Sequence, residues 1–259
     1  MDSQIVPGTL GDVLYANPQG KTIPEGEWTD LLRRVARSEL DALHRLYERA
    51  SRPVFILAFR ITGQLETAED VTLDVFEDVW RRAWSYDAAE GTVLAWIMNQ
   101  ARTRSRERAR LGPDPGERAA GAPPGSSDAL APRHSVQSRL ARRIADLLHV
   151  EPAPPPRPEW KEPAWEYVAP GIACKLLATD EERERVSMMV RLDPDAAYPP
   201  HTHMGREELH LLDGELWIED RKLVPGDYNR AEATTGDIRV WSGTGCSCVL
   251  VTSTKDKLG

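Results

Sequence analysis

Proline is distributed very unevenly along this chain of 259 residues, and its distribution is the strongest constraint on the fold. Of the 20 prolines, 11 lie between Gly112 and Pro163. Proline lacks a backbone N–H and has a fixed φ, so a stretch this rich in proline does not continue a helix or a central strand. The sequence therefore predicts two folded halves, residues 27–111 and 164–259, joined by a linker at 112–163.

The two halves differ in hydrophobic periodicity. Residues 27–111 repeat apolar side chains at helical spacing, whereas residues 164–259 contain short apolar runs broken by Gly, Pro, Asp and Asn. We expect an all-α domain followed by an all-β sandwich or barrel. Residues 1–26 show no sustained pattern and are interpreted as an N-terminal arm. The predicted strands span residues 172–179, 185–192, 208–212, 216–219, 239–241 and 248–253.

One segment inside the linker is amphipathic and predicts a short helix at 135–150. Ser135 is a suitable N-cap, and arginines lie on the polar face. A helix this short is marginal alone, so we expect it to dock on another part of the protein. Its apolar stripe consists of Val136, Leu140, Ile144 and Leu147.

Composition excludes several classes of protein. The chain has 33 basic and 41 acidic residues, a net charge of −8, which argues against a protein that coats nucleic acid along its whole length. Three cysteines, an odd number, favour a reducing compartment over a disulfide framework. No run of about 18 apolar residues and no signal-peptide pattern is present. We expect a cytoplasmic protein without membrane contact.

Two segments of the helical half carry concentrated charge of opposite sign. Each is either a solvated helix face or a binding surface, the acidic one for a basic partner and the basic one for phosphates. The acids of the first segment are Glu66, Glu69, Asp70, Asp74, Glu77 and Asp78. The arginines of the second segment are Arg102, Arg104, Arg106, Arg108 and Arg110.

The order of certain blocks in this half is more specific than its charge. The sequence Ala68-Glu69-Asp70-Val71 is followed by Val75-Phe76, Val79-Trp80 and later by Trp96 and Ala101-Arg102. With these blocks, residues 29–111 resemble region 2 of sigma-70-type factors, most closely the extracytoplasmic-function subclass. Leu73, Thr103 and Glu107 depart from the family pattern.

The resemblance implies two partners for the helical half. The acids Glu69, Asp70, Asp74, Glu77 and Asp78 would bind the RNA polymerase core. Trp96 and the five arginines would contact the −10 promoter element, since aromatic stacking and arginines together hold single-stranded DNA. Region 4, which reads the −35 element in such factors, has no counterpart after Leu111, so we expect regulation rather than two-site promoter reading.

The most chemically specific motif in the β half is His201-x-His203, followed by Glu207. Alternate side chains of a strand share one face, so two imidazoles and a carboxylate would converge. Such a set binds zinc, manganese or iron. The sequence predicts a divalent metal, with zinc the first choice. Glu208 is the rival carboxylate, and His210 is interpreted as a packing or surface residue.

Two cysteines near the end of the β half admit two interpretations. Cys246 and Cys248 would share one face of a strand. Buried core cysteines are the simpler interpretation, and a redox-sensing pair is the alternative.

The spacing His201-x-His203, three residues, Glu207, six residues, Gly214 is that of a first cupin motif. With Pro225-Gly226-Asp227-Tyr228, it makes residues 164–256 similar to the cupin of ChrR-type anti-sigma factors. The resemblance implies a jelly-roll barrel with a fourth metal ligand. Asp237 occupies the position where the family has a histidine, and it is either an oxygen ligand or a surface acid. The Cys-x-x-Cys of the family's other domain is absent.

Three functions remain open on this basis. The first is a transcriptional regulator in which a metal-binding sensory cupin controls a sigma-like domain that binds RNA polymerase and promoter DNA. The second is a metal-dependent cupin enzyme, an oxygenase or isomerase, with a degenerate docking domain. The third is a sigma mimic that titrates an anti-sigma factor.

Overall fold

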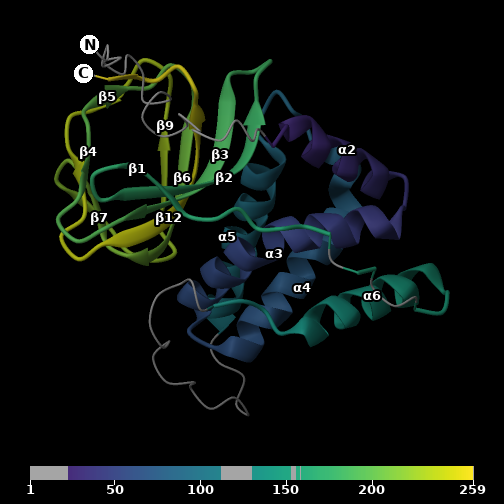
Figure 1. Cartoon of the computed structure of the whole chain (residues 1–259). Helices are drawn as coiled ribbons and strands as arrows, with labels where there is room; N and C mark the ends of the chain where they lie inside the picture. The colour runs from purple at the N-terminus through teal and green to yellow at the C-terminus, as the bar shows by residue number, and fades with distance from the viewer. Residues whose placement is uncertain (1–22, 112–129, 153–155, 158, 259) are drawn as a thin grey trace. The chain divides into compact units, whose positions relative to one another are not determined.

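A computed structural model describes residues 23–111, 130–152, 156–157 and 159–258. These residues form two compact units, here called the helical unit (Gly26–Glu162) and the β unit (Pro163 onward, with the residues before Gly26). The division into an all-α and an all-β part is confirmed (Figure 1). Most of the predicted arm and much of the Pro/Gly-rich linker lie outside the described residues. No described helix is long and apolar enough to cross a membrane.

The helical unit is built around one long buried helix, α3. It contains α2 (Glu25–Ala36), α3 (Leu40–Thr62), α4 (Leu65–Arg82), the 3-10 turn η1 (Ala83–Ser85), α5 (Val93–Leu111) and α6 (His134–Leu148). α3 packs against α4, α5 and α6. Gly63 ends it in the left-handed conformation, with φ 73° and its N–H bonded to the carbonyl of Phe59. This turn allows α4 to start two residues later and fold back along α3.

α4 separates its apolar and acidic side chains onto opposite faces. Val71, Val75 and Val79 are buried, and Phe76 packs its ring against Tyr47 of α3 with a centroid separation of 4.9 Å. This apolar face matches the helical spacing read from the sequence. Its burial fixes the rotation of α4 and directs most of the acidic side chains to the other side.

α6 confirms the predicted linker helix but differs from it at both ends. Arg133, not Ser135, is the N-cap and makes no side-chain cap, and His149 ends the helix in the left-handed conformation. Val136, Leu140 and Ile144 are fully buried against α4 and α3, whereas Leu147 is exposed. The linker expected at 112–163 thus includes a helix that is packed as part of the helical unit.

The β unit consists of antiparallel sheets of six, four and three strands. The larger sheet has the order β1-β2-β3-β12-β6-β9 and the second the order β4-β11-β7-β8. A short third sheet has the order β10-β5-β13. The strands are β1 (Glu166–Ala169), β2 (Ile172–Asp180), β3 (Arg185–Leu192), β4 (Ala197–Tyr198), β5 (His201–Thr202), β6 (Glu207–Gly214), β7 (Leu216–Ile218), β8 (Arg221–Leu223), β9 (Tyr228–Ala231), β10 (Gly236–Asp237), β11 (Val240–Trp241), β12 (Cys246–Ser253) and β13 (Lys257–Leu258).

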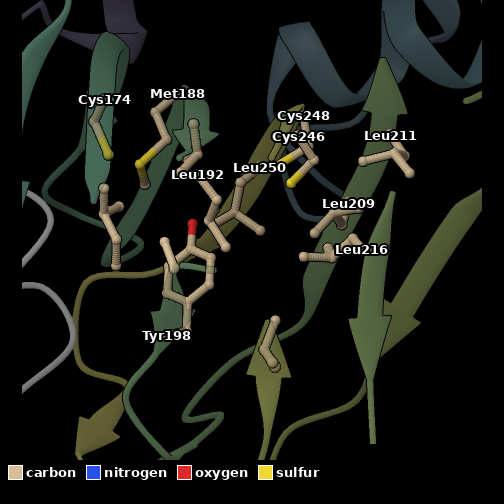
Figure 2. Packing of buried hydrophobic residues seen from close by; sticks show 14 of the residues in the cluster. Cys174, Met188, Leu192, Tyr198, Leu209, Leu211, Leu216, Cys246, Cys248 and Leu250 are labelled. Carbon is tan, nitrogen blue, oxygen red and sulfur yellow. The ribbon is translucent and has the colours of Figure 1, made fainter. Parts of the chain in front are cut away.

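The inner faces of these sheets enclose the core of the β unit. Met188, Leu209, Leu216 and Leu250 come from four different strands and are buried in one cluster (Figure 2). All six predicted strands are present, one with the predicted ends (residues 185–192) and five with shifted ends. The two-residue strands β4, β10 and β13 were not predicted, because partner strands define them and local hydrophobic alternation does not. The strand expected to carry both His201 and His203 is β5, which contains His201 and ends at Thr202, before His203.

Candidate metal centre and charged helix faces

Three strands and one loop bring four potential metal ligands together in the β unit. His201 lies on β5, Glu207 begins β6, and Asp237 lies on β10 directly opposite His201. His203 follows β5, and its backbone N–H and carbonyl are bonded to the loop before β10. One donor atom from each of the four side chains lies within 4.8 Å of the others.

Each of the two imidazoles has its Nδ1 within hydrogen-bond distance of an oxygen of another residue. Nδ1 of His201 lies 3.1 Å from the carbonyl of Pro199, and Nδ1 of His203 lies 3.1 Å from the hydroxyl of Thr235. Nε2 of His203 lies 3.7 Å from Glu207 and 3.8 Å from Asp237. This Nε2 is buried and has no hydrogen-bond partner among the described residues. A ligating histidine commonly has its second nitrogen anchored in this way.

Charge and burial shift the pKa values of this group. Burial lowers the pKa of His203, but its interaction with the nearby carboxylate of Glu207 and the charge of Asp237 outweigh that effect, and the net pKa is raised. Burial, followed by the negative charge of Glu207, raises the pKa of Asp237 above the ordinary value, against the opposing effect of His203. Two carboxylates held close together gain from a cation between them.

Sequence reasoning missed one acid that supports the group. Asp256 is fully buried, accepts a hydrogen bond of 2.6 Å from the backbone N–H of Met204, and is bonded to the hydroxyl of Thr252. It fixes the loop directly after His203. The sequence Lys255-Asp256-Lys257 gave no signal of burial, because flanking charges are typical of a surface turn.

The donor set fits a transition metal. Two imidazole nitrogens and two carboxylate oxygens suit zinc, manganese or iron. The buried Nε2 of His203, which has no hydrogen-bond partner among the described residues, is a donor available to ligate a cation. The cavity beside the group measures about 10 Å³ and is lined by Leu209, Ile218 and Leu250 among others. That volume holds about one water molecule.

Glu208 and His210 lie outside the group. The hydroxyl of Tyr228 donates a 2.7 Å hydrogen bond to Glu208, and the ring of His210 packs against the same tyrosine at 4.9 Å. Both side chains are buried. Glu207 and Glu208 are consecutive residues of β6 and point to opposite faces, so only Glu207 faces the histidines.

The cysteines of the β unit are buried and unbridged. Cys174, Cys246 and Cys248 contribute to the core shown in Figure 2. Burial raises the pKa of Cys174 and of Cys246 to about 12. A thiol becomes reactive as the thiolate, which this environment disfavours. The arrangement therefore favours core cysteines over a redox pair.

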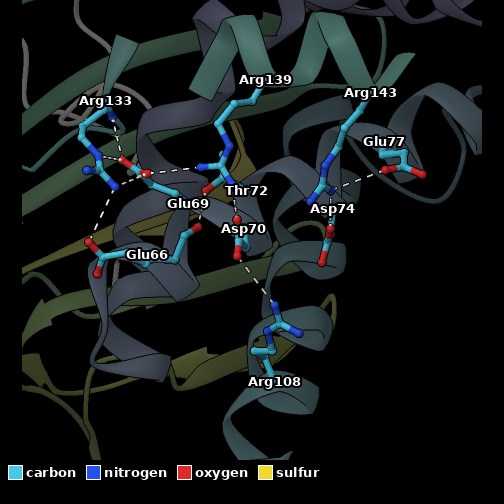
Figure 3. A network of polar contacts seen from close by, with 11 residues as sticks. Glu66, Glu69, Asp70, Thr72, Asp74, Glu77, Arg108, Arg133, Arg139 and Arg143 are labelled. Carbon is cyan, nitrogen blue, oxygen red and sulfur yellow. Dashed lines mark hydrogen bonds and ion pairs between the residues drawn. The ribbon is translucent and has the colours of Figure 1, made fainter. Parts of the chain in front are cut away.

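The acidic face of α4 is paired with arginines from the same unit. Arg133 clasps Glu69 with two hydrogen bonds of 2.7 Å, and Arg139 bonds to Asp70 (Figure 3). Of the predicted polymerase-binding acids, Glu69 is completely buried. Asp70, Asp74, Glu77 and Asp78 keep partly exposed side chains.

The arginines of α5 divide into two groups. Arg104 is 2.7 Å from Asp78 and Arg108 is 3.9 Å from Asp70, so both face α4. Arg106 and Arg110 are exposed, and Arg102 is half-buried. Trp96 is partly buried, with its ring edge-on to Tyr86 at 5.9 Å. Arg104 and Arg108 keep side chains that are 44% and 45% exposed, so these two arginines combine an ion pair to α4 with solvent exposure.

Comparison with protein families matches each unit separately. Residues 46–111 match the model of sigma-70 region 2. Residues 159–253 match the model of the ChrR cupin-like domain. Both resemblances read from the motifs are confirmed. The sigma match includes α4 and α5, and the cupin match includes all four members of the metal group.

Curated relatives resemble the helical unit. The ECF RNA polymerase sigma factor SigK of Mycobacterium ulcerans is 36% identical over 92 residues, which cover 34% of this chain and 49% of that protein. SigK of Mycobacterium tuberculosis strain H37Ra is 34% identical over 80 residues, which cover 31% and 43%. The chain thus spans about half or less of the length of these relatives.

Solved structures similar to the chain include KdgF from Halomonas sp., with 25% identity, a TM-score of 0.30 and coverage of 36% of this chain and 86% of that one. An acetylacetone dioxygenase from Acinetobacter johnsonii is 13% identical, with a TM-score of 0.31 and coverage of 32% and 60%. Likenesses at these TM-scores support no conclusion about activity. The chain therefore contains one region similar to sigma-70 region 2, with extracytoplasmic-function sigma factors among its relatives, and a second region similar to the ChrR cupin-like domain.

Proposed function

We propose that this protein is a transcriptional regulator whose helical unit binds RNA polymerase and −10 promoter DNA under the control of a metal-binding cupin. The observation that carries the proposal is the sigma-70 region 2 match, which includes both charged helices, α4 and α5. The acids of α4 would bind the polymerase core, and Trp96 with the arginines of α5 would bind DNA. The ChrR cupin-like match supports the regulatory half of the proposal.

The proposed metal ligands are His201, His203, Glu207 and Asp237. Their donor atoms converge within 4.8 Å, which supports including Asp237 in place of a histidine. We propose zinc, which takes four nitrogen and oxygen ligands readily, with manganese and iron as outcomes of elemental analysis. A bound divalent ion would supply the positive charge that two buried carboxylates lack. It would also join β5, β6 and β10, so its loss would loosen one end of the β unit.

A sensory role fits the cupin better than catalysis on an organic substrate. The cavity of about 10 Å³ beside the ligands has room for one water-sized molecule. Its walls are formed by the proposed ligands His201, Glu207 and Asp237, by Tyr198 and by the aliphatic side chains of Leu209, Ile218, Val240 and Leu250, so Tyr198 is the one polar side chain outside the ligand set among these lining residues. The enzyme alternative would require a substrate pocket next to the metal, whereas metal sensing requires only the ligands themselves.

The direct test measures binding of the full-length chain to bacterial core RNA polymerase, with zinc and after chelation. Binding that differs between the two states supports the proposal, and no binding in either state overturns it. A run-off transcription assay then separates a sigma factor from a sigma mimic. A mimic would bind its protein partner without giving a transcript.

The DNA contact is tested by the salt dependence of binding to a −10 promoter fragment in the presence of polymerase. The double variant Arg106→Glu/Arg110→Glu should weaken binding and reduce the slope of log affinity against log salt by about 2, because each phosphate contact releases about one counterion. The matched control is Arg37→Glu/Arg142→Glu, which makes the same charge change at two exposed positions outside α5, one in the turn after α2 and one on α6. Equal slopes for both variants would contradict the assignment of α5.

A further inference from the structure

The acidic face of α4 already has a partner of the right chemistry inside the chain. Arg133, Arg139 and Arg143 are spaced so that they follow the acids of α4 in order (Figure 3). Arg133 bonds to Glu69, Arg139 bonds to Asp70, and Nη1 of Arg143 lies 2.7 Å from Asp74 and 3.5 Å from Glu77. Four of the five acids assigned to polymerase binding therefore contact α6 or its N-cap.

Among the acids of α4, Glu69 accepts the most hydrogen bonds from the arginines of α6 and its N-cap. Its two carboxylate oxygens accept two side-chain hydrogen bonds of 2.7 Å from Arg133 and one of 3.2 Å from the backbone N–H of Arg133. Its side chain is 1% exposed. A carboxylate buried and satisfied in this way cannot meet another protein unless Arg133 moves away.

Apolar packing holds α6 in the same place. Val136, Leu140 and Ile144 are fully buried, and α6 contacts both α4 and α3. The arginine pairs are partly exposed and so contribute little each. The buried aliphatic side chains supply most of the attraction, and the arginines set the register of α6 along α4.

A second attachment follows α6. The ring of Trp160 lies 4.8 Å below the guanidinium of Arg49 on α3, and Glu48 accepts hydrogen bonds from the backbone N–H groups of Glu159 and Trp160. Glu162 bonds to Arg52 of the same helix. The chain passes from this attachment directly into the β unit at Pro163.

We propose that α6 and its N-cap Arg133 form a built-in cap, anchored to α3 by the segment at 159–162, and that this cap must leave the acidic face of α4 before RNA polymerase can bind there. This inference rests on the proposed function, because it assumes that the acidic face is the polymerase-binding surface. The partner and the cap compete for the same carboxylates. The apparent affinity for polymerase is therefore the intrinsic affinity reduced by the fraction of molecules that are uncapped.

Because the cap is covalently continuous with the β unit, a change in the β unit can alter how strongly the cap is attached to the helical unit. The last attachment, Glu162 to Arg52, precedes the first residue of the β unit. A change in the β unit that favours the detached segment would raise the uncapped fraction. This requires only that the metal-bound and metal-free states differ in their preference for the capped form.

The test compares two substitutions on neighbouring residues of α6 in the full chain. Arg143→Glu places a third acid beside Asp74 and Glu77 and should raise the affinity for core RNA polymerase about tenfold. Arg142→Glu makes the same change in net charge at an exposed position and should leave the affinity within about twofold of the original. Binding is measured without DNA, so the arginines of α5 do not contribute.

Hydrogen–deuterium exchange provides a second readout of the same event. Adding polymerase should increase exchange in residues 134–148 of the unsubstituted chain, while α3 stays protected. Equal polymerase affinity for Arg143→Glu and the unsubstituted chain, with α6 still protected in the complex, would overturn the cap and leave the proposed function intact. Failure of both variants and of the unsubstituted chain to bind polymerase would instead overturn the proposed function, and the cap with it.

Discussion

The metal group of the β unit and the acidic face of α4 differ in whether other side chains of the protein pair with their polar atoms. In the β unit, two imidazoles and two carboxylates converge, and Nε2 of His203 has no hydrogen-bond partner among the described residues. In the helical unit, Glu69 and Asp74 each face an arginine. A buried polar group without a partner costs free energy. The first centre therefore gains by taking up a cation, whereas the second must lose contacts before another protein can bind.

The two centres should therefore bind a partner in different ways. The metal group gains new contacts, whereas the acidic face of α4 exchanges one set of contacts for another. A metal adds contacts to the β unit and removes none that the structure shows, so its effect should appear as extra stability. A protein partner of α4 replaces arginine contacts, so its net gain is only the difference between new and lost interactions. Substitutions at the two centres should accordingly have different signatures.

The largest expected effect is the loss of metal in His203→Ala. This substitution removes the central imidazole, whose Nε2 lies between Glu207 and Asp237. We expect zinc affinity to fall by about a hundredfold or more, because a ligand matters more than the supporting residues worth 10- to 100-fold. The measurement is competition with a chromophoric chelator. His134→Ala, at an exposed helix end, is the control, and equal zinc affinities would contradict the site.

Metal removal should destabilise one unit and spare the other. With free zinc at about 100 times its dissociation constant, chelation should lower the stability of the β unit by about 2.7 kcal/mol. Amide hydrogen–deuterium exchange, measured on peptides from each unit at increasing temperature, follows the two units separately. A shift confined to the β unit is expected. An equal shift of both units would show that they do not respond separately.

Disrupting the ion pair between Glu69 and Arg133 should lower the free energy of unfolding of the helical unit by a somewhat smaller amount. Glu69→Gln removes the charge that Arg133 clasps, and we expect a loss of about 2 kcal/mol in its free energy of unfolding. The exposed guanidinium, 55% accessible, remains hydrated and limits the loss. Glu66→Gln is the control, because Glu66 is 57% exposed and lies 3.7 Å from the same arginine. Urea unfolding followed at 222 nm measures both, and equal losses would contradict the special position of Glu69.

The smallest expected effect concerns the acid that stands where a histidine was expected. Asp237→Asn keeps the size of the side chain but removes its charge, and we expect zinc affinity to fall about tenfold. Asp237→His should retain or raise it, since imidazole is a good zinc ligand. An Asp237→Asn variant with unchanged affinity would make Asp237 a bystander beside a three-ligand site.

How well the sequence predicts a feature depends on how far apart in the chain its residues lie. His201, His203 and Glu207 lie within seven residues, so their spacing alone indicated a shared site. Asp237 lies 30 residues beyond Glu207, and only the pairing of β10 with β5 brings it opposite His201. Asp256 gave no signal, because its burial depends on the fold of the chain around it.

The helical unit shows the same limit. The acidic and apolar faces of α4 follow from its 3.6-residue period, and the amphipathic pattern identified α6 as a helix that docks. The pattern did not reveal its target. Glu69 and Arg133 are 64 residues apart in the chain, so no local pattern pairs them.

By itself, the sequence determined the division into a helical and a β half, the charge on each helix and three of the four proposed metal ligands, with Asp237 as a candidate for the fourth from the cupin resemblance. These are properties of short segments, governed by proline content, periodicity and residue spacing. Tertiary structure alone decided that Asp237 meets His201 and that the arginines at α6 cover the acids of α4. Such contacts join distant segments, and they form only when apolar faces have packed and fixed which charged side chains lie opposite one another.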